Sequence, residues 1–379
     1  MQFVLNEEQL QIQKMVKEFS VKELEPSVLE RDEDSIFDRD LYDKMAAQGF
    51  TGICFEEKYG GAEMDYLSYI LAIEEMSKVD DGMAISMSAT VSLAATPIYD
   101  FGTEEQKEKF LVPLAEGAKM GAFGLTEPNA GTDAGSQQAT AVLDGDEYVL
   151  NGSKIFITNG GEADIYVIIA ITDKARGARG ISAFIVEKGT SGFSIGAKEN
   201  KMGIRTSITT ELIFQDCRIP VANRLGKEGD GFKVAMKTLD GGRIGVAAQA
   251  LGIATAALDH SIRYSKERQQ FGKPISANQA VSFMLADMAM KIDAARFLVY
   301  RAAWCKQNNL PFAKEAAMAK CFASDVAMEV TTNAVQVYGG YGYSKEYPVE
   351  RLMRNAKITQ IYEGTNQVQR MVIASAILR

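Results

Sequence analysis

Histidine and cysteine are scarce in this sequence, and their scarcity limits the chemistry available to it. The 379 residues include one histidine, His260, and four cysteines, Cys54, Cys217, Cys305 and Cys321. One histidine excludes a histidine-rich metal site, and the wide spacing of the cysteines argues against a Cys-x-x-Cys zinc or redox site. We therefore expect no metal, buried free thiols, and a histidine that faces solvent or is bonded locally.

Common nucleotide and hydrolase motifs are absent as well. The sequence has no G-x-G-x-x-G, no P-loop and no G-x-S-x-G, so a nucleotide cofactor would not be bound by a Rossmann device. No apolar run approaches the ~20 residues of a membrane-spanning helix. The net charge of -9 argues against nucleic acid or an anionic membrane as a partner. The N-terminus lacks a signal-peptide pattern, so we expect a cytoplasmic protein or a mature chain whose leader was removed.

Sequence periodicity divides the chain into a helical, a β-rich and a second helical zone. The order predicts an α+β fold that is mostly α. We expect an N-terminal helical domain over residues 1–120, a middle domain over 121–227 and a C-terminal helical domain over 228–379. Alternating runs with close turn signals predict an antiparallel sheet or barrel in the middle domain. Asp144-Gly145 and Asn151-Gly152 are both typical of hairpin turns.

Two apolar stripes at helical spacing run through the last zone. They are rich in alanine, which lets helices pack closely, and we expect them to be core. The stripes are Met284, Met288, Ile292, Ala295, Val299 and Ala303, and then Ala323, Ala327, Val330, Ala334 and Val337.

Several glycine-containing segments could carry chemistry, although each also has an ordinary structural explanation. The loop over residues 122–136 offers backbone N–H groups and the hydroxyls of Thr126 and Thr132. It could line a flavin ring or a pyrophosphate, or it could be a simple connector. Gly241 and Gly242 stand in a helical context and indicate either a helix start or a close approach of a ligand to the backbone.

Glu363 is a lone carboxylate near the C-terminus, between Tyr362 and Gly364. Gly364 lets the backbone turn, and Asn366 with Gln369 resembles the start of a helix. The helix dipole would lower the pKa of the carboxylate, whereas a base working near neutral pH needs a pKa raised by burial. The sequence leaves this choice open, along with an ordinary capping or surface role.

The joint order of these segments resembles the acyl-CoA dehydrogenase family across essentially the whole chain, with the short-chain (butyryl-CoA) members of anaerobic bacteria as the nearest likeness. The matching motifs are "AFGLTEPNAGTD", "IFITNG", "KMGIRTS", "LDGGRIGVAAQALG", "ERQQFGKPI", "AVQVYGGYGY" and "IYEGTNQVQR". The resemblance implies a barrel-like β domain between an N-terminal helical domain and a C-terminal four-helix bundle. It also implies non-covalent FAD, a homotetramer, and electron-transferring flavoprotein as the electron partner.

The resemblance also implies which residues contact FAD. Thr126 would meet the pyrimidine edge and Thr158 the N5 side, and Phe156 stands where the family often has tryptophan. Arg268, Phe271 and Gln279 would reach the FAD of a neighbouring subunit. The full set is Phe123, Leu125, Thr126, Gly131, Thr132, Phe156, Ile157, Thr158, Arg268, Phe271, Gln279, Gln336, Gly339, Gly340, Thr365, Asn366 and Gln367.

By the same resemblance, Glu363 is the catalytic base that takes an α-proton from an acyl-CoA thioester while a hydride leaves the β-carbon for flavin N5. The implied substrate contacts are Thr132, Asp240, Arg243, Tyr362 and Gly364. The expected reaction is interconversion of butyryl-CoA and crotonyl-CoA. The alternatives are a related 2-enoyl-CoA reductase acting on acrylyl-CoA or an aryl-propenoyl-CoA such as caffeoyl-CoA, an acyl-CoA oxidase, and a non-catalytic flavin- or CoA-binding scaffold.

Overall fold

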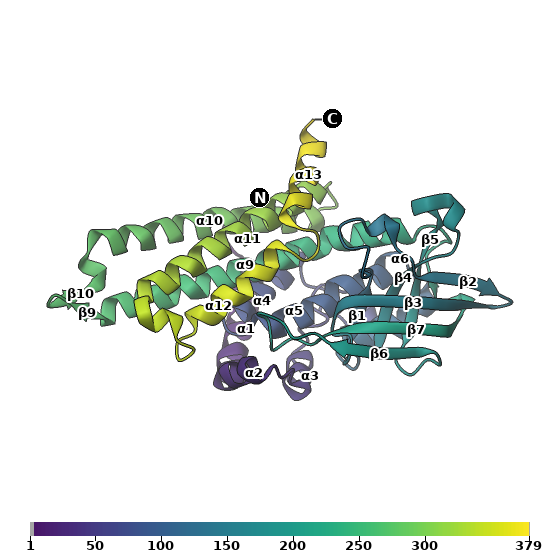
Figure 1. Ribbon diagram of the computed structural model, residues 1–379, viewed down its shortest axis with the longest axis horizontal. Helices are drawn as coiled ribbons and strands as arrows, with labels where there is room; N and C mark the ends of the chain where they lie inside the picture. Colours follow the sequence, from purple (N-terminus) through teal and green to yellow (C-terminus); the bar gives the residue numbers. More distant parts are fainter. Residues whose placement is uncertain (1–3, 379) are drawn as a thin grey trace.

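In the computed structural model, which describes residues 4–378, the β-sheet lies at one end of the molecule (Figure 1). The N-terminal helices lie beside the long C-terminal helices and also contact the sheet (Figure 1). This arrangement confirms the predicted mostly helical fold with a middle β domain.

The N-terminal part consists of short helices whose starts are marked by polar side chains. Asn6 and Gln9 form the capping box of the first helix, and Thr103 and Gln106 form another. The helices are α1 (Glu7–Phe19), α2 (Val28–Asp34), α3 (Arg39–Ala47), α4 (Tyr66–Ser77), α5 (Asp81–Ser88), the π-helix η4 (Ala89–Ala95), α6 (Thr96–Phe101), α7 (Glu104–Gln106) and α8 (Val112–Ala115).

The sheet is mainly antiparallel, as predicted, with two parallel contacts. The strand order is β6-β7-β3-β2-β4-β5-β8, and β1 pairs with β4. The parallel neighbours are β1 with β4 and β2 with β4. The strands are β1 (Gly121–Gly124), β2 (Thr140–Asp144), β3 (Glu147–Thr158), β4 (Ile165–Ile171), β5 (Ile181–Glu187), β6 (Phe193–Lys198), β7 (Thr209–Pro220) and β8 (Arg224–Leu225).

Only one of the two predicted hairpin turns is a turn. Asp144 pairs with Glu147, so Gly145 lies in the tight turn between β2 and β3. Asn151-Gly152 was wrongly predicted as a turn, because both residues lie inside β3, where the register with β7 shifts. Gly152 has φ 134°, and a glycine at such a shift is typical of a β-bulge rather than a chain reversal.

Long helices make up the C-terminal part and bury both predicted stripes. The first stripe lies in α10, where only Met284 stays partly exposed, and the second is buried throughout α11. The elements are α9 (Gly231–Glu267), the hairpin strands β9 (Gln269–Gln270) and β10 (Lys273–Pro274), α10 (Gln279–Gln307), α11 (Ala313–Tyr338), α12 (Val349–Ala356) and α13 (Asn366–Ile377).

The outer face of α10 carries large apolar side chains at seven-residue spacing. Phe283, Met290, Phe297 and Trp304 are 58%, 64%, 45% and 37% exposed. We call these four residues the outer stripe of α10. A regular apolar stripe on a long helix is the pattern of a helix that packs against another helix.

The cysteines are buried largely as expected. All four cysteines are free thiols, of which Cys54 is half-buried and the other three are buried. His260 is partly buried rather than fully solvent-facing, and burial lowers its pKa to about 4, so it is neutral at pH 7. Across residues 4–378 no helix is long and apolar enough to cross a membrane, and no cluster of side chains in that range is placed to hold a metal ion.

Candidate active site

The turn before the last helix has an unusual backbone. Glu363 and Gly364 lie between the short helix η11 (Lys357–Gln360) and α13. Both have positive φ values, 52° and 91°. Glycine adopts this conformation freely, but for a glutamate it costs on the order of 1–3 kcal/mol and persists only where surrounding contacts fix it.

Side chains from two long helices and from α13 fix this turn through its carbonyl groups. Arg243 of α9 donates from Nε to the Glu363 carbonyl at 3.3 Å. Gln369 of α13 donates from Nε2 to the Glu363 and Gly364 carbonyls at 3.2 and 2.9 Å. Lys320 of α11 donates from Nζ to the Gly364 carbonyl at 2.8 Å. The turn is therefore anchored to α9, α11 and α13.

The Glu363 carboxylate lies directly against Gly242 of α9. A Cβ added at Gly242 would overlap Glu363 Oε2 and would come within 2.8 Å of Glu363 Cδ and 2.9 Å of Leu93 Cδ2. The predicted helix start at this glycine pair is wrong, because α9 begins at Gly231. The alternative was a close approach of a ligand to the backbone, and the group that the structure places against Gly242 is instead the glutamate of this same chain.

Burial decides the protonation of this carboxylate. Its Oε2 atom is buried, and no group among residues 4–378 donates a hydrogen bond to it. Burial raises the pKa of Glu363 to about 7, although the positive charges of Arg243 and Lys320 act to lower it. The choice that the sequence left open is thus settled in favour of desolvation. A carboxylate with such a pKa suits a general base near neutral pH.

Most of the predicted substrate contacts surround the same carboxylate. Asp240 forms an ion pair with Arg243 at 2.6 Å, and burial raises the pKa of Asp240. Tyr362 donates its hydroxyl to Gln249 Oε1, and burial raises the pKa of that hydroxyl well above its usual range. Thr132 differs from the others, because it lies exposed in the loop that follows β1.

One group of the predicted FAD residues comes together at the edge of the sheet. The loop after β1 runs beside the end of β3, where the Ile155 N–H donates to the Thr126 carbonyl at 2.9 Å. Phe123 and Leu125 are buried, whereas Phe156 is 61% exposed and has φ 58°. Ile157 is buried and Thr158 is half-buried beside it.

A buried ion pair fixes the shape of this loop. Lys154 of β3 donates from Nζ to Glu127 Oε1 at 2.7 Å and to the Leu125 carbonyl at 3.1 Å. Glu127 in turn accepts the backbone N–H groups of Gln138 and Ala139. Both charged side chains are at most 5% exposed, so a buried ion pair connects the loop to β3.

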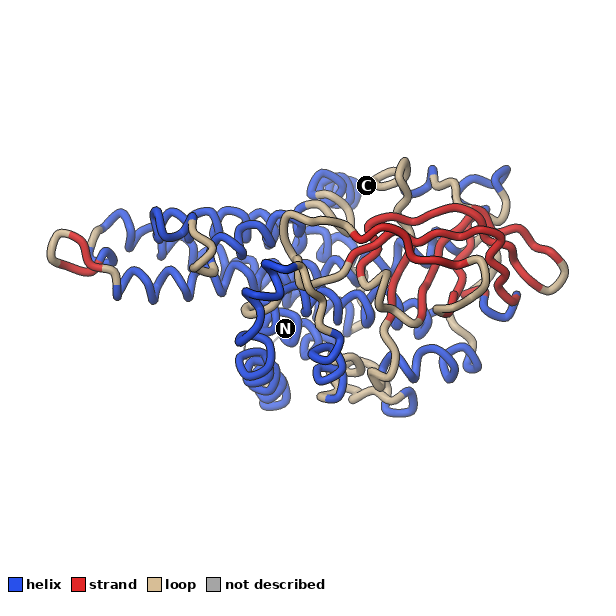
Figure 2. The backbone as a smooth tube through the Cα atoms, turned by 60° about the horizontal axis from the view of Figure 1, so that its bottom comes forward, coloured by secondary structure: helices blue, strands red, loops and turns tan. Residues whose placement is uncertain are grey.

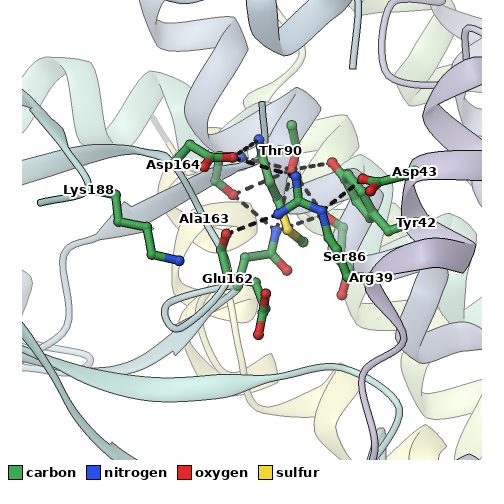
Figure 3. A network of polar contacts seen from close by, with 12 residues as sticks. Arg39, Tyr42, Asp43, Ser86, Thr90, Glu162, Ala163, Asp164 and Lys188 are labelled. Atoms are coloured by element: carbon green, nitrogen blue, oxygen red, sulfur yellow. Dashed lines mark hydrogen bonds and ion pairs between the residues drawn. The ribbon is translucent and has the colours of Figure 1, made fainter. Parts of the chain in front are cut away.

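The end of β3 is also tied to the N-terminal helices. Asn159, which follows Thr158, donates from Nδ2 to the Ser86 carbonyl of α5 at 2.8 Å and to the Gly121 carbonyl of β1 at 3.0 Å. Figure 3 shows Arg39 and Tyr42 of α3 beside Thr90 and the turn at Glu162. Tyr42 donates to Thr90 Oγ1 at 2.8 Å, and Arg39 donates to the Glu162 carbonyl at 3.2 Å.

A second group of predicted FAD residues lies far from the sheet. Figure 2 shows the β9–β10 hairpin at the opposite end of the long helices from the sheet. Phe271 at its tip is 96% exposed, and the Arg268 guanidinium lies 5.5 Å from the centre of the Tyr341 ring. The exposed members of this group are Arg268, Phe271, Gln279, Gln336, Gly339 and Gly340. Within one chain, these residues therefore do not contact the predicted FAD residues at the edge of the sheet, which we call the sheet group.

The third group is the start of α13, next to Glu363. Thr365 caps the helix by accepting the Val368 N–H at 3.3 Å, so Asn366 is the first helical residue and not the cap. The Asn366 amide bonds Lys320, Ser324 and Asp325. Its side chain is thus already bonded within the chain, while Gln367 is exposed.

The chemistry of the sheet group fits a flavin. An exposed phenylalanine beside buried apolar side chains offers a stacking surface for a planar ring. Thr126 and Thr158 supply hydroxyl groups for its polar edge. A Cβ added at Gly131 would meet no atom within 4 Å, so the loop there leaves open space beside its backbone.

Sequence reasoning missed three buried residues of the site: Lys154, Lys320 and Gln369. Each has a side chain at 0% exposure. A signal for Lys320 existed, because it stands on the same helical face as the alanine stripe that starts at Ala323. A charged residue on an apolar stripe indicates a buried partner. Gln369 was interpreted only as part of a helix start, and Lys154 only as part of a strand.

Comparison with known proteins agrees with the geometry. Family models described as acyl-CoA dehydrogenase N-terminal, middle and C-terminal domains match residues 6–118, 122–217 and 229–378. A short-chain-specific acyl-CoA dehydrogenase of Megasphaera elsdenii is 62% identical over all of both chains. The structure of butyryl-CoA dehydrogenase from Megasphaera elsdenii matches with a TM-score of 0.99, 62% identity and full coverage of both chains. A chain in a structure described as the electron transferring flavoprotein of Acidaminococcus fermentans matches equally well, with a TM-score of 0.99, 66% identity and full coverage of both chains.

Proposed function

The chain belongs to the acyl-CoA dehydrogenase family, whose members are FAD-dependent oxidoreductases acting on the CH–CH group of acyl-CoA, and we propose that this member interconverts butyryl-CoA and crotonyl-CoA. The observation that carries the proposal is the Glu363 carboxylate. Its Oε2 atom is buried without a partner among the described residues, and burial raises its pKa to about 7.

The reaction removes a proton from the α-carbon and a hydride from the β-carbon, and leaves a double bond between them. Glu363 accepts the proton. FAD, when bound by the residues at the end of β3, supplies the hydride acceptor. The backbone N–H of Glu363 is positioned by the fixed turn to donate to the thioester oxygen, and such a donor is worth several kcal/mol as negative charge develops there.

The contacts of Glu363 hold its carboxylate in one orientation. Gly242 gives the carboxylate room against α9, and the carbonyl contacts of Arg243, Lys320 and Gln369 prevent the turn from relaxing. A base held in a productive orientation lowers the entropic part of the barrier. Leu93 of η4 lies near the carboxylate, and an apolar side chain there favours a hydrocarbon substrate.

The test is flavin bleaching by butyryl-CoA under anaerobic conditions. Glu363→Gln keeps the size of the side chain and removes the base, so it should retain yellow FAD and lose bleaching. Glu30→Gln, an exposed change in α2, serves as the matched control and should bleach like the wild type. Bleaching of the Glu363→Gln protein at the wild-type rate would overturn the assignment of the base.

The alternatives from the sequence are outcomes of a substrate panel. Crotonyl-CoA, acrylyl-CoA and caffeoyl-CoA are offered to the chemically reduced protein, and the fastest reoxidation identifies the acyl group. Near-stoichiometric hydrogen peroxide during turnover in air would indicate an acyl-CoA oxidase. A protein that binds FAD but is bleached by no thioester would be a scaffold.

We propose electron-transferring flavoprotein as the electron partner and a homotetramer as the assembly. The exposed β9–β10 hairpin lies remote from the sheet group within one chain, and Phe271 at 96% exposure is unusual unless another subunit covers it. The outer stripe of α10 supplies a further apolar surface for a second copy. A cytoplasmic location fits this assignment.

A further inference from the structure

The mechanism above assigns no role to the charge of Lys320. This lysine lies on α11 with a side chain at 0% exposure. Its Nζ donates to the Gly364 carbonyl at 2.8 Å and to Asn366 Oδ1 at 2.9 Å. Both acceptors are neutral. A buried ammonium is expensive unless an anion compensates it, so its position beside the base needs an explanation.

The two cations near Glu363 are not equivalent. Arg243 is compensated by Asp240, whose carboxylate lies 2.6 Å away. Lys320 has no such partner, because no carboxylate among residues 4–378 lies within ion-pair distance of it. The groups whose charges act on Lys320 are Glu363, Cys321, Arg243 and Asp325. Of these, Glu363 is the anion that contributes most to its stabilisation.

We propose that Lys320 is a positioning residue for the catalytic base, which bonds the Gly364 carbonyl and whose uncompensated positive charge favours the anionic form of the Glu363 carboxylate. The inference rests on the proposed function of Glu363. Both groups that Lys320 bonds belong to the turn and to the start of α13, so we expect it to act through the turn and through its charge.

The two ionisable groups affect each other in opposite directions. Burial raises the pKa of Glu363 to about 7, and the charges of Arg243 and Lys320 restrain that rise. Burial lowers the pKa of Lys320 to about 8, and Glu363 opposes that fall. The other ionisable groups that interact with the carboxylate are the hydroxyls of Tyr66, Tyr69 and Tyr362. Burial raises the pKa of each of these hydroxyls, so all three are neutral near pH 7.

The prediction has a defined sign. Burial raises the pKa of Glu363, and the positive charge of Lys320 limits that rise. Without this charge the pKa should rise by about one further unit, which is the lower end of the effect of a nearby opposite charge. With a starting value near 7, the base would then be about one-tenth ionised at pH 7 instead of one-half, a loss of about fivefold in rate. At high pH the difference should vanish.

The experiment measures bleaching by butyryl-CoA against pH in three proteins. Lys320→Gln keeps a hydrogen-bond donor and removes the charge. Asn366→Asp keeps Lys320 and places a carboxylate within bonding distance of its ammonium. This variant therefore compensates the positive charge of Lys320 without removing the lysine. Lys201→Met is the matched control, because burial also lowers the pKa of Lys201 to about 8, while its Nζ bonds the Ser207 carbonyl at 2.7 Å.

We expect the rising limb of the pH profile to move upward in the first two variants and to stay unchanged in Lys201→Met. An infrared pH titration of the FAD-loaded proteins without substrate, with Glu363→Gln subtracted, follows the protonated carboxyl directly and does not depend on turnover. A rate that is lower at every pH with an unmoved midpoint would show a merely structural role and overturn the proposal.

These outcomes separate the inference from the proposed function. If the wild-type protein is not bleached by any acyl-CoA, the proposed function fails. If the wild type is bleached normally and neither variant shifts the midpoint or the infrared titration, the inference alone fails. Should Lys320→Gln not fold with FAD, Asn366→Asp decides the question, since it preserves side-chain size at every position.

Discussion

The substitution Gly242→Ala adds one methyl group that should affect helix stability and the position of the catalytic base in different ways. Alanine is favoured over glycine in the interior of a helix by roughly 0.5–1 kcal/mol. Gly242 lies well inside α9, so propensity alone predicts a more stable protein. The structure predicts a less active one, because the new Cβ would overlap Glu363 Oε2 and come within 2.8 Å of Glu363 Cδ.

The size of the effect follows from that distance. Carbon atoms in contact are about 3.5–4.0 Å apart, so the Glu363 carboxyl carbon has to retreat by roughly 1 Å. Leu93 Cδ2, at 2.9 Å from the same Cβ, blocks part of the retreat. Misplacement of a reacting group by ~1 Å costs on the order of 100-fold in rate. Stopped-flow bleaching by butyryl-CoA measures this rate directly.

Gly241→Ala is the matched control in the same helix. A Cβ there would meet Lys306 Nζ at 2.7 Å, which is the far end of a flexible side chain and can shift. We expect Gly241→Ala to gain helix stability in thermal unfolding and to keep a bleaching rate within a few-fold of the wild type. Equal bleaching rates in both alanine variants would refute the claim that Gly242 makes room for the base.

Three further outcomes are expected. Because the folded-state pKa of Glu363 is raised to about 7, the carboxylate destabilises the fold increasingly from about pH 5 to pH 8, so Glu363→Gln should gain roughly 2 kcal/mol over the wild type at the higher pH and little at the lower. Thermal unfolding at both pH values tests this sign. Met290→Asp in the outer stripe of α10 should dissociate the assembly on sedimentation and shift the emission of Trp304, the sole tryptophan, to longer wavelength. Lys154→Met should strand the Glu127 charge and release FAD on gel filtration, and the double change with Glu127→Gln should retain more of it.

The sequence predicted most of the fold because its signals are local. The stripe from Met284 to Ala303 and the strand runs repeat with the period of their own element, so they need no knowledge of the neighbours. The turn predicted at Asn151-Gly152 was wrong because a turn signal is also local and carries no information about strand pairing. The pairing of β3 with β7 decided that this glycine relieves a bulge. The division into domains at residues 120 and 227 stays a prediction.

The candidate site was less accessible to local reasoning. Glu363 was singled out through the order of motifs, yet its protonation depends on burial that no nearby residue signals. Lys320 was missed because its acceptor, Gly364, lies 44 positions further along the chain. A role that consists of a contact between distant segments leaves only an indirect trace, here a lysine on an alanine-rich face. The individual site roles therefore stay proposals for the experiments above.

Three departures from local preference converge on the Glu363 carboxylate. Glu363 itself has a left-handed backbone, Gly242 interrupts the interior of a long helix, and Lys320 buries an ammonium without a paired carboxylate among the described residues. Each departure costs on the order of 1 kcal/mol or more when taken alone. When several unfavourable local features surround the same functional group, a functional requirement is the expected reason for them. Relieving any of them should therefore slow proton abstraction by more than any loss of fold stability accounts for, a pairing that ordinary core residues do not show.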